Sequence, residues 1–161
     1  MARDIDLGDL NNVMDNARAN IRELFNLYQH DELGVRFTEI YEEEHKAPKR
    51  NSVAIDIDSF STTQRAWHNR TSIRYTIGIN VNIWYYHEDL NEKTRKRDVM
   101  QVVWRIANMF VKHVTVNGFC SELGCEIISS EYLPQITDQK IIAAGVVRIK
   151  LNKLFQVVNA D

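Results

Sequence analysis

The chain has 161 residues, of which 44% are hydrophobic and 26% are charged, and its formal net charge at pH 7 is −2. This is an ordinary globular composition, and the length fits one domain over residues 1–161 with a single core. The near-neutral charge gives no electrostatic basis for general binding to nucleic acid or to an anionic membrane. No apolar run approaches the ~20 residues of a membrane span, and the start lacks a signal-peptide pattern, so we expect a protein made in the cytoplasm.

The first predicted element is a long amphipathic helix between Asp9 and Asp31. Its apolar residues recur at helical spacing, Asp9 can cap its start, and Gly34 lies just beyond its end. A short strand is predicted over Phe37 to Tyr41. A charged connection follows this strand and contains the acidic run Glu42, Glu43 and Glu44.

Two segments then alternate between apolar and polar residues, Ser52 to Ser59 and Thr71 to Tyr86. Alternation with a period of two predicts strands. The stretch Phe60 to Arg70 has no strong period, and we expect it to join the two strands as the extended tip of an antiparallel hairpin. Since a strand usually has about five or six residues, the second segment is long enough to project beyond its own core, as strands do when they serve assembly.

A second amphipathic helix is predicted from Asn91 to about Val114. After a turn at Asn117 and Gly118, strands are predicted over Gly124 to Tyr132 and over Ile141 to about Val157. The order α-β-β-β-α-β-β predicts an α+β fold, a mainly antiparallel sheet of four to five strands with a long projecting hairpin, covered by the two helices. The apolar face of the second helix is formed by Val99, Val102, Val103, Ile106, Phe110, His113 and Val114.

One pair of carboxylates suggests chemistry. Asp56 and Asp58 lie two apart on a predicted strand, so both side chains project from one face and could share a divalent metal with a third ligand. With the triplet Asp138-Gln139-Lys140 they loosely match a metal-dependent nuclease, which is the alternative function of a different class. That pattern needs the triplet on the strand next to the first acid, whereas here it lies far along the chain in a predicted turn. We therefore expect no nuclease site.

No other residues have the spacing of a catalytic or cofactor-binding site. The five histidines lack metal-binding spacing, and we expect His113 to be a core histidine bonded to the backbone. His113, Cys120 and Cys125 would give zinc three ligands and no fourth, and we expect both cysteines to be reduced thiols. The sequence contains no phosphate-binding loop and no nucleophile elbow. We therefore expect no enzyme activity, no catalytic residue, no metal site and no cofactor.

Basic residues cluster at the start of the second predicted helix, where the helix dipole disfavours each cation by about 0.3 kcal/mol or more. Placement against a local preference points to an external partner, although a solvated face is the ordinary explanation. If this cluster meets the acidic run Glu42, Glu43 and Glu44 of a neighbouring subunit, the contact sets register more than affinity. The basic cluster consists of Lys93, Arg95, Lys96 and Arg97.

Three aromatic side chains are difficult to assign to the core. Trp84 and Tyr86 fall on the polar side of the long strand, and Trp67 falls in the hairpin tip with Arg65 and Arg70. Exposed aromatic residues are enriched at interfaces. These positions and the two charge clusters are therefore predicted to form an oligomer or tube interface.

The long strand carries the pattern Tyr75, Ile77, Ile79 and Val81, and the second helix begins after an acidic turn at Glu88-Asp89. With the order of elements over nearly the whole chain, these features resemble the tail terminator, or tail completion, family of tailed bacteriophages. The resemblance lies in the order of elements rather than in a motif, since the family has no invariant catalytic residue to match.

The resemblance implies one tail-terminator-like domain that forms a six-membered ring on the completed tail tube, stops its growth and offers a surface to the neck of the filled head. The implied partners are further copies of the chain, the tail tube protein or its sheath, and a neck or head-completion protein. Genomic DNA would pass through the lumen without sequence-specific binding. The protein would reside in the virion tail or neck, and in the host cytoplasm during assembly. The nearest alternative is another neck component, such as a head-completion or head-tail joining protein.

Overall fold

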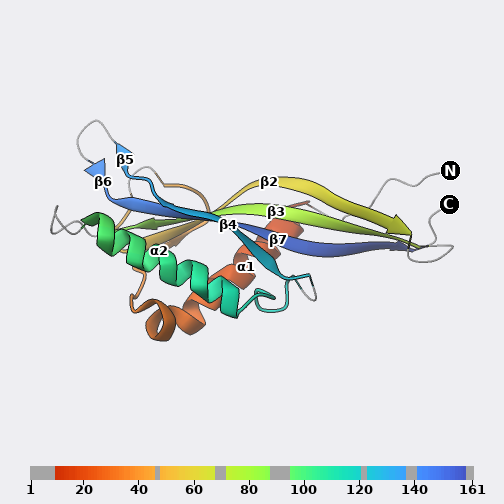
Figure 1. Ribbon diagram of the computed structural model, residues 1–161, viewed down its shortest axis with the longest axis horizontal. Helices are drawn as coiled ribbons and strands as arrows, with labels where there is room; N and C mark the ends of the chain where they lie inside the picture. Colours follow the sequence, from red (N-terminus) through yellow and green to blue (C-terminus); the bar gives the residue numbers. More distant parts are fainter. Residues whose placement is uncertain are drawn as a thin grey trace.

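The computed structural model describes residues 10–45, 48–67, 72–87, 95–120, 123–136 and 141–158. They form an α+β fold in which two helices lie on one face of a mixed five-stranded sheet with the order β1-β2-β3-β7-β4 (Figure 1). The pairs are antiparallel except for β1 and β2, which are parallel. The predicted fold class is therefore confirmed. The elements are α1 (Leu10–Tyr28), the π-helix η1 (Gln29–Leu33), β1 (Ile40–Tyr41), β2 (Ser52–Trp67), β3 (Ser72–Tyr86), α2 (Arg95–Lys112), β4 (Cys125–Tyr132), β5 (Gln135–Ile136), β6 (Ile141–Ile142) and β7 (Ala144–Val158).

The described part of the first helix agrees with its prediction except in its last turn, which is a π-helix, and the predicted cap Asp9 lies outside the described residues. Gly34 ends the π-helix in the left-handed region, with φ of 66°, and its N–H donates to the carbonyl of Gln29. Arg105 of α2 donates to the carbonyl of Leu33 over 3.1 Å. This contact satisfies a carbonyl at the helix end and ties the two helices together.

The first two strands differ from their predictions. β1 has only two residues where a strand was predicted over Phe37 to Tyr41. β2 continues to Trp67, through a stretch predicted to be an irregular connection. The pairing of β2 with β3 shifts register between Ile57 and Ser59 and again between Thr62 and Gln64. Each bulge reverses the alternation of side chains, so the sequence loses its period of two although the strand continues.

The predicted projecting hairpin is a ribbon of three strands. β3 pairs with β2 on one side and, along its whole length, with β7 on the other. In Figure 1 these three strands continue well beyond the end of both helices. Tyr75 and Phe155 face each other across β3 and β7, and Phe155 packs against a small cluster of Ile73, Tyr75 and Ile77. The ribbon therefore has an apolar cluster of its own.

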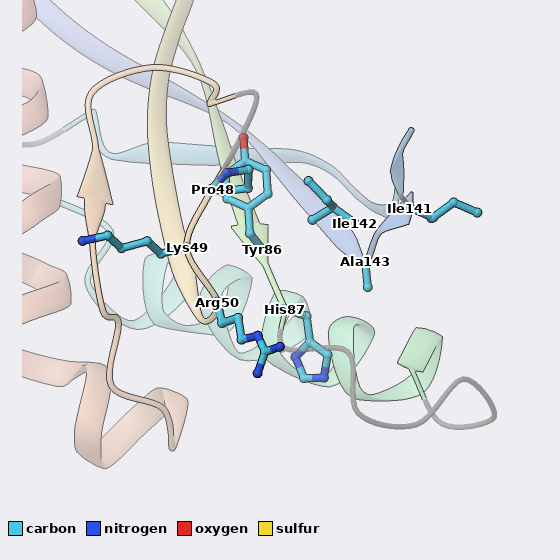
Figure 2. Close-up of a pocket in the computed structure, with 8 residues that line it drawn as sticks. All are labelled: Pro48, Lys49, Arg50, Tyr86, His87, Ile141, Ile142 and Ala143. Carbon is cyan, nitrogen blue, oxygen red and sulfur yellow. The ribbon is translucent and has the colours of Figure 1, made fainter. Parts of the chain in front are cut away.

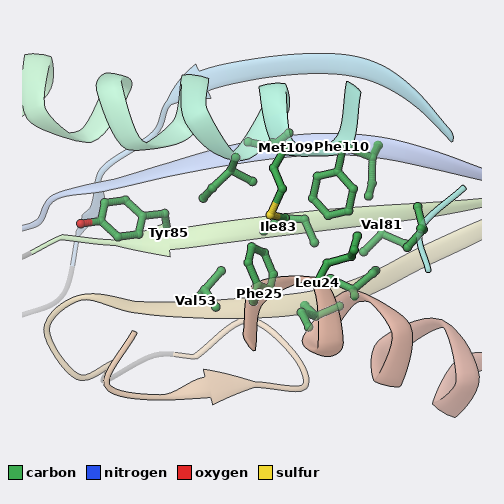
Figure 3. Close-up of a cluster of buried hydrophobic side chains, with 14 of the residues drawn as sticks. Leu24, Phe25, Val53, Val81, Ile83, Tyr85, Met109 and Phe110 are labelled. Atoms are coloured by element: carbon green, nitrogen blue, oxygen red, sulfur yellow. The ribbon is translucent and has the colours of Figure 1, made fainter. Parts of the chain in front are cut away.

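The main core lies between the helices and the sheet (Figure 3). Phe25 of α1 is fully buried, and its ring meets Phe37 edge-on at 5.3 Å and Phe110 of α2 at 6.2 Å. The central strand β3 contributes Val81 and Ile83, both fully buried, from the sheet face that packs against the apolar stripes of the helices. One face of the sheet is thus buried against the helices, and the outer edges of the sheet can contact other chains.

The second face of the sheet carries a smaller apolar cluster that corrects one prediction. Trp84 and Tyr86, predicted to be exposed, are 7% and 0% exposed. Their rings stack at 6.4 Å, and Tyr41 and Leu133 pack against their cluster. Alternation correctly assigned the two residues to the face away from the helices, but this end of that face is itself covered. Burial raises the pKa of Tyr86 to about 12, and its hydroxyl accepts the His45 N–H over 3.1 Å.

The remaining differences are local. Residues 88–94, where the second helix was predicted to begin, lie outside the described residues. β5 lies between the last two predicted strands, where no strand was predicted, and the last predicted strand is interrupted at Ala143. His113 is bonded to a side chain rather than to the backbone, since its Nε2 lies 3.0 Å from Glu32 Oε1. Within the described part of the chain, neither helix has the length and apolarity needed to cross a bilayer.

Candidate functional site

The sheet has two edges on which another chain could pair. On the outer side of β2, β1 covers only Val53 and Ala54, and no other described strand pairs with β2 on that side. At the other edge, β4 pairs with β7 on its inner side, and none of the described strands lies on its outer side. Unpaired edges present backbone N–H and C=O groups that can receive an added strand.

The predicted acidic run lies at the β2 edge. Glu42, Glu43 and Glu44 follow β1 directly, and all three are exposed. The structure brings this run close to Asp56 of β2. The pKa of Asp56 is raised by burial and then by the charges of Asp58 and Glu43. This edge therefore gathers several carboxylates, with Arg18 and Arg22 of α1 beside Glu42.

The predicted basic cluster lies at the opposite edge. Lys96 and Arg97 are exposed at the start of α2, and Lys96 Nζ lies 5.9 Å from the ring centre of Tyr132, the last residue of β4. The sequence of α2 contains five basic residues and one acidic residue, Asp98. Arg97 Nε is 3.8 Å from the Asp98 carboxylate, and the Arg97 side chain is 78% exposed. The exposed cations at the start of α2 therefore lie beside the last residue of β4, whereas β4 itself carries the exposed Glu126 and Glu131.

The two charged regions lie at the same end of the sheet. Tyr132 of β4 pairs with Gly145, which in turn pairs with Tyr85 of β3. The same row continues through Val53 of β2 to Ile40 of β1. The acidic run and the basic start of α2 thus lie near opposite ends of one row of residues, so they can meet when two copies stand edge to edge.

A further surface feature was missed by the sequence analysis. Met100, Trp104, Ala107 and Val111 of α2, with Ile127 and Ser130 of β4, line a mostly apolar groove, here called the α2–β4 groove. Trp104 is 73% exposed and Val111 is 61% exposed. The four helix residues lie four, three and four positions apart, a second apolar stripe beside the core stripe. That spacing was present in the sequence and could have revealed the groove.

The other predicted interface residues are placed only in part. Arg65 and Trp67 lie in the far half of β2, where their backbones pair with Tyr75 and Ile73. Arg70 and Lys93 lie outside the described residues. Trp84 and Tyr86, being buried, are not available on the surface of this chain. Trp104, which was not among the predicted interface residues, is exposed instead of Trp84 and Tyr86.

A pocket on the second face lies beside Tyr86 (Figure 2). The side chains of Arg50 and His87 lie close together on one side of it, and Lys49 points away. His87 Nδ1 is 2.9 Å from the hydroxyl of Tyr85, and Lys49 Nζ is 3.5 Å from Glu39. His87 and Lys49 therefore contact other residues of the same chain at this end of the fold.

The residues considered for metal and nucleophile chemistry are also placed. Among the described residues, no group of three or more His, Cys, Asp or Glu side chains could hold a metal ion. The triplet at 138–140 lies outside them. Burial raises the pKa of Cys120 to about 12 and that of Cys125 to about 11, so both thiols stay protonated at neutral pH.

Comparison of the chain with protein-family models and with curated proteins finds no match.

Proposed function

We propose that this chain is a structural virion assembly protein that caps the completed tail tube of a bacteriophage as a ring. The ring, of six copies, stops tail growth and provides the surface to which the head attaches through its neck. The observation that carries the proposal is the pair of open sheet edges, one beside the acidic run and the other beside the basic start of α2. A contact between two different surfaces of the same chain repeats from copy to copy, and it closes into a ring when the rotation allows.

The three-stranded ribbon supports a role beyond self-association. β2 and β3 have 16 and 15 residues, and β7 has 15, more than a sheet of this size needs to cover two helices. A ribbon that continues past the helices gives each copy a surface away from its neighbours' core. In the proposed ring this surface contacts the tail tube. The same features would also suit another neck component. Which structure the ring binds, the tail tube or the connector of the head, distinguishes the two functions.

The proposed function predicts a closed ring at the end of tail tubes. Purified protein mixed with assembled tubes should bind only at tube ends, and end views in negative stain should show six copies. Size exclusion with light scattering gives the state of the chain alone. A protein that binds connector rings and ignores tubes would favour the neck component, and one that stays monomeric and binds neither would contradict the proposal.

Reversal of the basic cluster is expected to weaken the ring and leave the fold intact. Replacing Lys93, Arg95, Lys96 and Arg97 with glutamate would place like charges opposite the acidic run of the next copy, at a cost of about 0.2–1 kcal/mol per lost exposed pair. Reversing the acidic run to lysine in the same chain should restore assembly. Light scattering at low and high salt checks this, since exposed pairs are screened over about 8 to 10 Å.

Thermal melting of each variant is the control, because the described members of both clusters lie on the surface or partly so. If the double reversal assembles no better than the single one, the two clusters do not meet.

A further inference from the structure

The α2–β4 groove has the properties of a protein contact. Its helix wall carries Trp104, which is 73% exposed, and its strand wall carries Ile127, which packs against the core. Ile128, next along β4, is 55% exposed. Tryptophan is among the residues that contribute most to interfaces, and exposed apolar patches of this kind mark docking sites. The groove also runs beside the open edge of β4, so one partner can occupy both.

The direction of the strands selects a partner for this edge. β2 and β3 are antiparallel, β3 and β7 are antiparallel, and β7 and β4 are antiparallel, so β4 runs opposite to β2. When a second copy stands beside the first in the same orientation, its β2 edge approaches β4 as an antiparallel strand. The added strand continues the antiparallel pairing of the sheet from one copy into the next.

The faces of the strands supply an apolar side chain for the groove. Phe60 of β2 pairs with Ile79, which is buried beneath the helices, so Phe60 lies on the helix face of the sheet. Ile127 and Ser130 pair with Ile149 and Val147, which are also buried on that face. A β2 strand added to β4 therefore carries its Phe60, which is 42% exposed in the single chain, onto the side where the groove lies.

Charge at the start of α2 fits the acidic run of a second copy. Lys96 and Arg97 are exposed there, whereas on β4 Glu131 pairs with Arg148 and Glu126 accepts a hydrogen bond from Asn152. The β2 edge carries Glu42, Glu43 and Glu44, which are exposed beside β1. Like charges across an interface suppress a pairing, and opposite charges fix its register.

We propose that the α2–β4 groove receives the β2 edge of a second copy of this chain, with Phe60 of that copy packing against Trp104 and Val111. This inference deepens the proposed ring by naming its contact. The contact has two different halves, a groove and an edge, so each copy uses both, and a defect in either half disables every contact between identical copies.

The two halves can be tested separately in solution, without tail tubes. Trp104→Asp disables the groove and Phe60→Asp disables the edge, and each should weaken association at least roughly thirty-fold, as expected for loss of a central aromatic contact. Each variant alone should be monomeric where the wild type assembles. In an equimolar mixture, the intact edge of the Trp104→Asp chain fits the intact groove of the Phe60→Asp chain. Light scattering should then show a dimer of the two variants and nothing larger.

Leu27→Asp is the matched control, since Leu27 is 53% exposed on α1 and does not line the groove. It should assemble as the wild type does. Val111→Asp and Phe60→Ser replace either aspartate variant that fails to melt cooperatively.

Several outcomes would overturn the inference. They are a Trp104→Asp or Phe60→Asp chain that assembles as the wild type does, a mixture that stays monomeric or grows past a dimer, and a wild type that stays monomeric from about 1 μM to about 1 mM. Because the test uses only this chain, failure of the ring to bind tubes would reject the proposed function and leave the contact intact.

Discussion

Replacing Val103 with aspartate is expected to prevent the chain from folding. Val103 is fully buried in the middle of α2, within the core between helices and sheet. An unpaired carboxylate there loses its hydration without gaining a partner, at a cost of several kcal/mol, which approaches the total stability of about 5–15 kcal/mol of a typical domain. We expect insoluble protein or, after refolding, a circular dichroism spectrum without a cooperative melt.

The control for this variant is Gln101→Asp, which adds a carboxylate to the same helix at an exposed position. It should be soluble and melt close to the wild-type temperature. A soluble Val103→Asp protein with an unchanged melting temperature would contradict the register that places Val103 in the core.

Adding a single methyl group at Gly145 is expected to destabilise the same region by about 1–3 kcal/mol, the usual cost of overpacking a core. A Cβ atom at this position would lie 2.4 Å from Val103 Cγ2 and 3.0 Å from Val99 Cγ1. Both are branched side chains on a packed helix, so neither can swing away. Urea unfolding of Gly145→Ala should show a lower midpoint with little change in slope.

Two further variants separate this clash from a general effect of alanine in a strand. In Gly78→Ala the three atoms nearest the new Cβ all belong to the flexible Lys150 side chain, which can move, so the loss of stability should be small. In a Val103→Ala background the blocking methyl group is gone, and Gly145→Ala should cost less than it does in the wild type. Equal costs in both backgrounds would show that Val103 is not the obstacle.

The elements with strong periodicity were predictable from the sequence. β3 alternates without a break, and the two helices carry continuous apolar stripes, so local pattern was enough to place them. β2 was predicted to end at Ser59 because two bulges interrupt its alternation while its pairing with β3 holds the strand together. A strand maintained by its neighbour rather than by its own pattern cannot be found from local sequence.

The candidate site was predictable only where it depended on composition. The charge clusters were visible in the sequence, but their positions at opposite edges depend on the strand order, which follows from long-range pairing. Trp84 and Tyr86 were assigned to the correct face, but alternation does not tell whether that face is covered. Trp104 was overlooked because α2 has two apolar stripes, and the core needs only one of them.

The position of β7 has a consequence for how the chain acquires its structure. β7 follows every other strand in the sequence, yet in the sheet it lies between β3 and β4. Until it enters, β2 and β3 form only a hairpin and β4 has no partner strand. Closing the sheet joins segments far apart in the chain, which costs loop entropy before the new contacts repay it. We therefore expect the sheet to be completed only when β7 pairs with β3 and β4, and the three-stranded ribbon and the β4 edge to form at that step.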